Sequence, residues 1–377
     1  MKPFTADDES FMRQALALAA AGEGRVSPNP PVGCVLVKNG AVVGRGWHDR
    51  LGDLHAEAMA LRDAGEAARD ADAYVTLSPC TTHGRQPPCS DALIRAGVAG
   101  VLVAADDPNP RNGSGVDLLN RAGVPARSGL LRDEAEYLAR GFFKMMRRHT
   151  PFVTLKYAMT LDGKIAAASG DSRWVSGPES REMVHDLRSR HDAVVVGSGT
   201  ALADDPLLNV RDPALSRRGG PDLHPQPARV VVDSRCRLPA SAAMLRSDSG
   251  PGGPVLVATA LERATDASKR LEAAGAEVLH LPGPDGRVDL KTLLNELGKR
   301  GKYMIFCEGG GGLAAGLLRA KLADELFAFI APKLIGGNKA PGPVADLGLN
   351  LMADALPLKV RECIRVGNDI CVRAGIV

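Results

Sequence analysis

Apolar positions recur at helical spacing in some stretches of the chain and form short β-type runs in others. Residues 8–22 carry apolar side chains on one face, which predicts an amphipathic helix ending at Gly22. Two apolar runs flank Asn39-Gly40, and this arrangement predicts a β-hairpin over 32–46. Helices are also expected over 55–64 and 89–96, with strands over 74–77 and 98–105. This order of elements predicts an α/β layered domain.

A second domain is expected after residue 151. The charged amphipathic pattern over 131–147 predicts one helix, which Pro151 prevents from continuing. We therefore expect domains over 1–147 and 151–377. Strands alternating with helices in the second half indicate a mostly parallel sheet covered on both faces, and the Pro- and Gly-rich segment 212–227 suggests a surface loop. The expected strands are 152–157, 193–196, 229–232, 254–258, 277–281, 304–307 and 326–330, with helical patterns at 261–274 and 313–322.

Composition narrows the classes of function. The chain has 377 residues, which is consistent with two domains, and its 47 Lys and Arg residues nearly balance 44 Asp and Glu residues. No strongly basic field favours a nucleic-acid partner. We find no apolar run near the length of a membrane span and no apolar signal core in residues 1–9. Seven scattered cysteines form a poor disulfide framework, so we expect a cytoplasmic protein.

One imidazole, one carboxylate and two thiols follow an order typical of a zinc deaminase. His55 and Glu57 begin one predicted helix, and Cys80 and Cys89 follow the next predicted strand. A catalytic zinc has three protein ligands and leaves its fourth position to water, so His55, Cys80 and Cys89 are the expected ligands. Zinc-bound water ionises to hydroxide more readily than free water, and Glu57 could carry its proton to a leaving amine.

The combination of these motifs is more specific than any one of them. A histidine at a helix start or a Pro-Cys pair usually has a structural role alone. The zinc deaminase signature is Pro-Cys-x-x-Cys, whereas eight residues separate Cys80 from Cys89 here. That longer loop contains His83 and Arg85, which could reach a phosphate or could equally be solvated side chains.

The motifs together resemble the RibD family of bifunctional riboflavin-biosynthesis enzymes. The resemblance covers nearly the whole chain and implies a cytidine-deaminase-like α/β/α domain followed by a dihydrofolate-reductase-like α/β domain. It implies that a diaminopyrimidinone bearing a ribosylamino 5′-phosphate loses ammonia by hydrolysis, and that NADPH then reduces the ribosyl group to ribityl. The residues carrying the resemblance are Asn29-Pro30, Val32-Gly33-Cys34, His55-Ala56-Glu57, Pro79-Cys80, Cys89 and Asp107-Pro108-Asn109-Pro110. The substrate contacts implied for the first domain are Asn29, His83, Arg85, Asp107 and Asn109.

Four glycines follow a predicted strand in the second half. The run Gly309 to Gly312 precedes a helical pattern that begins at Leu313. Backbone N–H groups of such a turn, together with a helix N-terminus, favour an anion such as a pyrophosphate. The pattern is not the G-x-G-x-x-G fingerprint, so a conventional Rossmann domain is not expected. A flexible turn is the other interpretation of a glycine run, but the flanking strand and helix favour phosphate binding.

The family resemblance implies two sets of contacts in the second domain. Arginines suit the substrate phosphate because a guanidinium matches its oxygens, although surface ion pairing is their more common role. Lys156 and Glu308 are candidates for the proton donor during hydride transfer. The residues expected to face NADP are Ala158, Trp174, Thr200, Asp204, Ser234, Gly310, Gly311, Gly312, Leu313, Ala314, Ala315 and Gly316. Those expected to face the substrate are Lys156, Ser172, Arg188, Leu208, Arg211 and Glu308.

Three alternatives remain open from the sequence. The chain could be a deaminase of nucleosides or RNA with an unrelated second domain. It could be a zinc-stabilised binding protein without catalysis, in which case Glu57 would have no chemical role. It could also have only one active half. We expect a small phosphorylated pyrimidine as the substrate and a homo-oligomer as the assembly.

Overall fold

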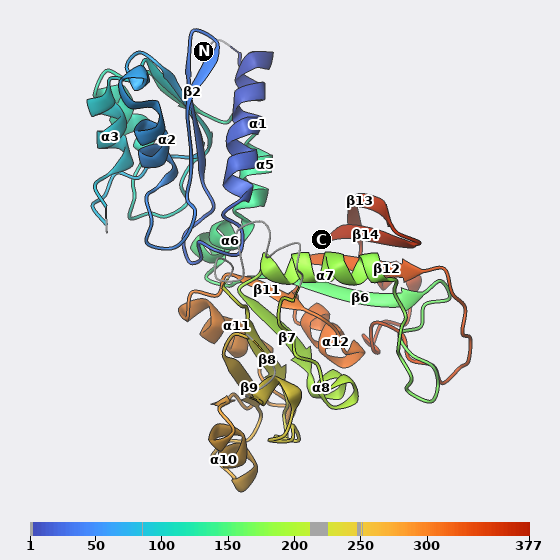
Figure 1. Ribbon diagram of the computed structural model, residues 1–377. Helices are drawn as coiled ribbons and strands as arrows, with labels where there is room; N and C mark the ends of the chain where they lie inside the picture. Colours follow the sequence, from blue (N-terminus) through green and yellow to red (C-terminus); the bar gives the residue numbers. More distant parts are fainter. Residues whose placement is uncertain (1–2, 85, 212–224, 247–249, 251) are drawn as a thin grey trace. The chain divides into compact units, whose positions relative to one another are not determined.

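The chain forms two compact units in the computed structural model, Met1–His149 and Thr150–Val377. The structure describes all residues except 1–2, 85, 212–224, 247–249 and 251 (Figure 1). Most of the predicted loop 212–227, and the predicted phosphate contact Arg85, therefore lie outside the described residues. Among the described residues, the helices are all too short or too polar to span a bilayer.

The first unit is a five-stranded sheet with helices on both faces. The strand order is β2-β1-β3-β4-β5, with β1 antiparallel to its two neighbours and β3, β4 and β5 parallel. Helices α2 and α3 cover one face, and α1 and α5 cover the other (Figure 1). The elements are α1 (Ala6–Ala20), β1 (Gly33–Lys38), β2 (Ala41–Trp47), α2 (Ala56–Ala64), β3 (Asp72–Leu77), α3 (Cys89–Ala96), β4 (Gly100–Ala105), α4 (Gly115–Arg121), β5 (Ala126–Ser128), α5 (Arg132–Leu138) and α6 (Arg140–Arg148).

The second unit is a nine-stranded mixed sheet covered on both faces. The strand order is β10-β9-β8-β7-β11-β6-β12-β14-β13. Neighbouring strands are parallel from β10 as far as β12, and β14 and β13 then continue the sheet in antiparallel pairs. One apolar core lies under α11 and α12, and a second lies under α7, α8 and α10. The strands are β6 (Phe152–Thr160), β7 (Ala193–Gly197), β8 (Ala228–Val232), β9 (Val255–Thr259), β10 (Glu277–His280), β11 (Met304–Cys307), β12 (Glu325–Ala331), β13 (Leu358–Val366) and β14 (Asp369–Ile376). The helices are α7 (Pro178–Ser189), α8 (Ser198–Asp204), α10 (Asp266–Ala273), α11 (Leu290–Lys299) and α12 (Gly311–Arg319).

The predicted fold class is confirmed, but several elements differ from expectation. The helix predicted over 261–274 begins only at Asp266, in α10. The single helix predicted over 131–147 is wrong: Ala139 leaves helical geometry and separates α5 from α6. Phe142 and Phe143 of α6 are both buried. The first two residues of α12 are glycines, so this helix begins at Gly311 rather than Leu313. The sequence also missed the hairpin of β13 and β14, because β13 is an exposed edge strand with charged residues through its length.

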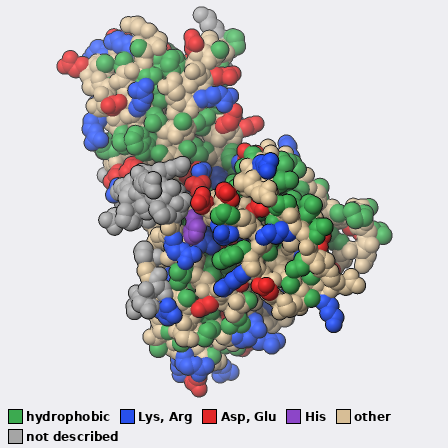
Figure 2. Space-filling model, turned by 45° about the vertical axis from the view of Figure 1, so that its right-hand side comes forward, with side chains coloured by type: hydrophobic (Ala, Val, Ile, Leu, Met, Phe, Trp, Pro, Cys, Tyr) green, Lys and Arg blue, Asp and Glu red, His purple; other side chains and the backbone are tan. Residues whose placement is uncertain are grey.

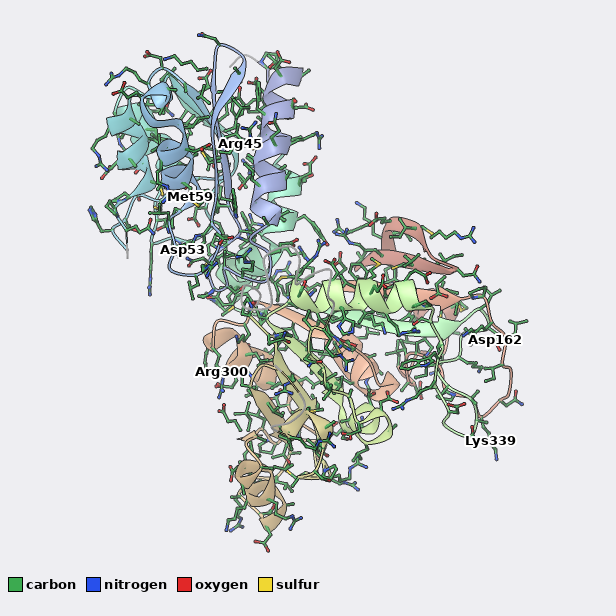
Figure 3. All side chains as sticks on the ribbon, in the orientation of Figure 1. Arg45, Asp53, Met59, Asp162, Arg300 and Lys339 are labelled. Atoms are coloured by element: carbon green, nitrogen blue, oxygen red, sulfur yellow. The ribbon has the colours of Figure 1, made fainter. Side chains whose placement is uncertain are left out.

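Side-chain contacts between loops also order the second unit. The Asp162 carboxylate accepts hydrogen bonds from the backbone N–H groups of Gly336 at 2.7 Å and Ile335 at 3.3 Å. This joins the loop after β6 to the loop after β12, and Figure 3 shows Asp162 at that end of the unit. At the other end, Arg300 after α11 forms a two-bond ion pair with Glu277 of β10.

Candidate functional site

Close packing of α2 on β2 determines where the first candidate site lies. A Cβ atom on Gly46 would lie 2.1 Å from the Ala56 carbonyl oxygen, and one on Gly44 would lie 2.4 Å from the Ala60 carbonyl oxygen. Only glycine leaves room for the backbone of α2 to approach the strand this closely. His55 is the N-cap residue of α2, so this contact fixes the position of the imidazole and of Glu57 in the first turn of the helix.

His55, Cys80 and Cys89 converge on one point. Cys80 follows β3 and Cys89 is the first residue of α3, and the three ligand atoms lie within 4.8 Å of one another. His55 Nδ1 is 3.3 Å from Cys89 Sγ and 3.7 Å from Cys80 Sγ. Zinc bonds to nitrogen and sulfur in a tetrahedral site would separate such atoms by about 3.6 Å. The three side chains therefore fit zinc and leave a fourth position for water.

The charge around these three residues suits a cationic centre. A hydrogen bond from Cys89 and another from His55 lower the pKa of Cys80 to about 4, despite its burial. The hydrogen bond to Cys80, together with burial, raises the pKa of Cys89, so without metal it is the thiol that donates to the Cys80 thiolate. Binding of zinc would release this remaining proton, since metal ligands must be deprotonated.

Glu57 is a buried carboxyl beside the cluster. It is 4 % exposed, and burial together with the negative charge on Cys80 raises its pKa to about 7. A carboxyl with this pKa can both accept and return a proton near neutral pH. Glu57 lines the same small cavity as His55 and Cys80, which has a volume of about 140 Å³.

Polar side chains expected to contact the substrate line this cavity in part. Asn29, Asp107 and Asn109 are among its lining residues, and their role as substrate contacts remains a prediction. Asp107 accepts hydrogen bonds from the Asn109 backbone N–H at 2.8 Å and from Asn112 Nδ2 at 2.5 Å, which holds its loop in place. His83 is exposed and does not line the cavity. The role of His83 as a substrate contact stays a prediction, because its side chain does not reach the cavity.

His48, which no sequence motif singles out, is a buried histidine in the wall of this cavity. Its Nδ1 lies 3.1 Å from the Leu54 carbonyl oxygen, which can only accept, so Nδ1 carries the proton. Its Nε2 therefore accepts a hydrogen bond from Asn29 Nδ2 at 3.0 Å, which leaves the Asn29 carbonyl oxygen directed to other partners. Burial lowers the pKa of His48 and favours this neutral form.

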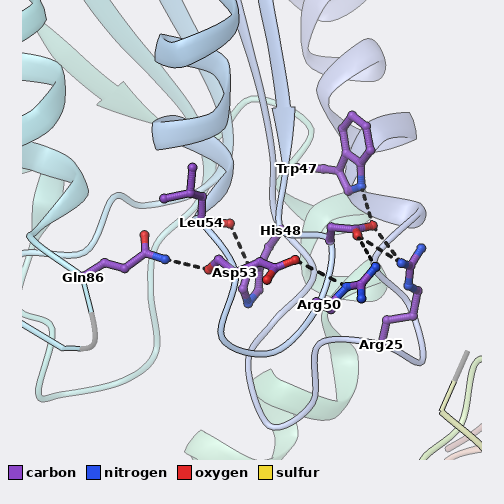
Figure 4. Close-up of polar contacts among 8 residues, drawn as sticks. Arg25, Trp47, His48, Arg50, Asp53, Leu54 and Gln86 are labelled. Atoms are coloured by element: carbon purple, nitrogen blue, oxygen red, sulfur yellow. Dashed lines mark hydrogen bonds and ion pairs between the residues drawn. The ribbon is translucent and has the colours of Figure 1, made fainter. Parts of the chain in front are cut away.

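A polar network supports the loop that carries His48. Figure 4 shows the Gln86 side chain donating to the Asp53 carbonyl oxygen at 2.7 Å, and the Gln86 amide oxygen also accepts from the His55 backbone N–H at 3.4 Å. Arg25 pairs with Asp49 at 3.0 Å on the other side of the same loop. Gln86 thus links the loop between the two cysteines to the segment that precedes α2.

The second candidate site is a cavity of about 1940 Å³ at the carboxyl ends of the parallel strands. Such an edge is where ligands usually bind in open α/β sheets. Ala314 and Ala315 do not line the cavity but are buried in α12 against the core. The expected residues that do line it are Lys156, Ala158, Ser172, Trp174, Arg188, Thr200, Asp204, Leu208, Arg211, Ser234, Glu308, Gly310, Gly311, Gly312, Leu313 and Gly316.

Three partly buried charges meet in this cavity. Arg188 and Glu308 form a two-bond ion pair, with 2.8 Å between Arg188 Nη2 and Glu308 Oε2. Burial alone would raise the pKa of Glu308, but Arg188 and Lys156 outweigh it and lower that pKa. Burial lowers the pKa of Lys156. A lysine whose proton is easier to release, next to a fixed ion pair, is suited to proton transfer.

The glycine turn has the conformation that an anion site requires. Gly309 and Gly310 have φ values of +100° and +87°, which side chains rarely allow, and α12 begins at the next residue. The first two residues of this nine-residue helix, Gly311 and Gly312, thereby present their backbone to the cavity without a side chain. Trp174 at the cavity edge is 65 % exposed and packs on Arg181, with its ring centroid 4.7 Å from the guanidinium carbon.

Two family models match the chain. The model described as "RibD C-terminal domain" matches residues 151–372, and the one described as "Cytidine and deoxycytidylate deaminase zinc-binding region" matches residues 5–105. The chain belongs to the RibD family. The family's zinc-binding region contains His55, Cys80 and Cys89, and its reductase region contains the larger cavity.

Relatives support this membership over the full length. The riboflavin biosynthesis protein RibD of Escherichia coli K12 is 43% identical over 371 residues, covering 97% of this chain and 98% of that protein. The RibD of Haemophilus influenzae is 42% identical over 98% of both chains. A solved structure of Acinetobacter baumannii RibD has a TM-score of 0.86 at 38% identity, covering 98% of this chain and 99% of that one.

A second solved structure gives the activities by name. It is a diaminohydroxyphosphoribosylaminopyrimidine deaminase and 5-amino-6-(5-phosphoribosylamino)uracil reductase from Thermotoga maritima, with a TM-score of 0.84 at 32% identity. It covers 98% of this chain and 99% of that one. The chain is thus a bifunctional deaminase and reductase of riboflavin biosynthesis, with zinc and NADPH as its cofactors.

Proposed function

We propose that residues 1–147 deaminate a diaminopyrimidinone bearing a ribosylamino 5′-phosphate and that residues 151–377 reduce the ribosyl group of the product. The convergence of His55, Cys80 and Cys89 beside buried Glu57 carries the first half of this proposal. The name of the Thermotoga maritima protein supports the choice of substrate. On the face shown in Figure 2, basic and acidic side chains are interspersed, which suits a small substrate better than a polynucleotide.

The deamination depends on one proton carrier. Zinc, when bound by His55, Cys80 and Cys89, supplies a water of lowered pKa. Glu57 takes a proton from the attacking water and delivers it to the amine that leaves as ammonia, so a single carboxyl serves as base and then as acid. Asn29, whose amide nitrogen donates to His48, accepts a hydrogen bond from the pyrimidine at its carbonyl oxygen.

The reduction depends on positioning. NADPH would supply the hydride, and the backbone N–H groups of the glycine turn Gly309–Gly312, which line the cavity at the start of α12, would bind its pyrophosphate. Arg188 and Arg211 bind the substrate phosphate, and Ser172 and Leu208 complete its pocket. Lys156 would donate the proton that accompanies the hydride, while Glu308 pairs with Arg188 and partly offsets the lowering of the Lys156 pKa by burial.

Two broader assignments belong to the same proposal. Exposed apolar side chains on and before β13, including Leu351, Met352 and Val360, support a homo-oligomer, which light scattering of the purified protein would test. The seven cysteines are all free thiols, which supports a reducing cytoplasm. Fractionation of cells expressing the protein tests that location.

The variant Glu57→Gln tests the deaminase half. It should keep zinc, because Glu57 is not a ligand, and it should lower ammonia release about 10²- to 10⁴-fold through loss of proton transfer. NADPH oxidation on deaminated substrate should continue, which serves as the internal control. Zinc binding with undiminished ammonia release would refute the role of Glu57. Turnover of cytidine, adenosine or RNA by the unaltered protein would favour a different substrate class.

A further inference from the structure

The larger cavity has a basic end that the proposed chemistry does not use. Arg235 and Arg237 follow β8, and both line the cavity on the side away from the Arg188–Glu308 pair. Because the carboxyl ends of parallel strands lie in the order of the sheet, β8 is separated from β11 by β7 alone. The turn after β8 is therefore about 10 Å from the glycine turn, at about 4.8 Å per strand.

The direction of the bound cofactor follows from the other end of the cavity. The substrate must meet the nicotinamide near Lys156, Arg188 and Glu308, which lie on β6, α7 and the end of β11. With the pyrophosphate at the glycine turn, the adenosine half must extend the opposite way along the sheet edge, toward β7 and β8. Arg235 and Arg237 lie along that path.

The turn that carries these arginines is held rigid by a buried acid. Asp233 has no exposed surface and accepts hydrogen bonds from the backbone N–H groups of Leu238 at 2.8 Å and Arg235 at 3.4 Å. Arg237 is held by Ser198, whose hydroxyl oxygen accepts from Nη2 at 2.6 Å, and lies 3.7 Å from Asp233. Both guanidinium groups are exposed to the cavity side of this turn.

The side chains of the turn after β8 differ from those of a site that selects NADH. Sites for NAD place a carboxylate on the ribose 2′-hydroxyl, whereas a nearby arginine accommodates the 2′-phosphate of NADP. Here the carboxylate after the strand, Asp233, is buried and bonded to its own turn, and the exposed side chains are guanidinium groups. Other acids at this end are engaged as well: Asp289 caps α11, and Asp285 lies 3.8 Å from Arg287.

We propose that Arg235 and Arg237 bind the 2′-phosphate of NADPH and set the preference of the reductase for NADPH over NADH. The proposal rests on the proposed function, since it takes the cofactor and its direction from there. A phosphate monoester carries nearly two negative charges at neutral pH, and planar guanidinium groups match its oxygens. Arg237 is pre-positioned by Ser198 and Asp233, and Arg235 supplies the second cation.

The test measures binding of 2′,5′-ADP and 5′-AMP by calorimetry, because these two ligands differ only in the 2′-phosphate. The full-length protein should bind 2′,5′-ADP more tightly. Arg235→Ala and Arg237→Ala should each weaken 2′,5′-ADP about 10- to 100-fold, as expected for loss of a charged hydrogen bond, and leave 5′-AMP within about twofold. The KM for NADPH should rise in parallel, and Arg235→Lys should recover part of the loss.

A matched control separates the site from general charge effects. Arg270 is an exposed arginine of α10 that does not line the cavity, and Arg270→Ala should leave both affinities unchanged. If the unaltered protein binds NADPH but both cavity variants keep its preference for 2′,5′-ADP, the inference is wrong while the proposed function stands. If the unaltered protein binds neither NADPH nor the two nucleotides, the proposed cofactor site itself is wrong.

Discussion

The contact between Gly46 and α2 allows the link between packing and the metal site to be tested. In Gly46→Ala, the new Cβ would lie 2.1 Å from the Ala56 carbonyl oxygen, 2.4 Å from the Ala60 nitrogen and 2.8 Å from Met59 Cβ. Two of these neighbours are backbone atoms, so the helix itself must shift. Overpacking of this kind costs about 1–3 kcal/mol. For a unit of this size, that lowers the melting temperature by roughly 2–12 °C.

The shift should also reach the chemistry, because Ala56 lies between His55 and Glu57. A displacement near 1 Å costs about 100-fold in a positioned reaction, so ammonia release should fall by that order. The assays are calorimetric melting of the protein, zinc content after dialysis, and ammonia release. NADPH oxidation by the second unit should be unaffected.

Gly84→Ala is the matched control for this variant. Gly84 lies in the loop between the two cysteines, and a Cβ there would have no described atom within 4 Å. This control should melt like the unaltered protein and keep its zinc. If Gly46→Ala also melts within about 1 °C of the unaltered protein and keeps full deamination, packing of α2 on β2 does not position the site.

Two further predictions concern the second unit. A fragment lacking residues 1–147 should remain folded and bind NADPH, because residues 150–377 form their own apolar cores. Fluorescence titration with NADPH measures this binding. A fragment that does not bind NADPH would mean that the domain boundary or the cofactor site lies elsewhere. The pKa of Glu308 is lower in the folded protein than its ordinary value of 4.5. Its pairing with Arg188 therefore stabilises the fold at pH values above 4.5, and this stability is lost as the pH falls through the lowered pKa of the folded state. Denaturant unfolding between pH 3 and pH 7 should show this loss, and Glu308→Gln should flatten that part of the profile; an unchanged profile would mean that the pair does not set acid stability.

Local pattern was sufficient for most elements of the fold. The hairpin around Asn39-Gly40 was predicted because both turn residues favour the positive φ values that the structure shows. The strands of the second unit were predicted because strands buried on both faces are nearly continuous apolar runs. The edge strand β13 has no such signal, since its exposed charged side chains resemble those of a loop. The break at Ala139 was also hidden, because an alanine by itself favours helix.

The residue types of the metal centre could also be recognised locally, and its geometry could not. The sequence by itself determined which imidazole and which thiols could bind zinc, and that each lies near the end of a helix or strand. Only the tertiary structure decided that His48 orients Asn29, that Arg188 meets Glu308 across 120 residues, and that Arg235 and Arg237 line the same cavity. The physical reason is that periodicity is a property of neighbours along the chain. Contacts between distant residues depend on sheet order and close backbone packing, which no short window of sequence contains.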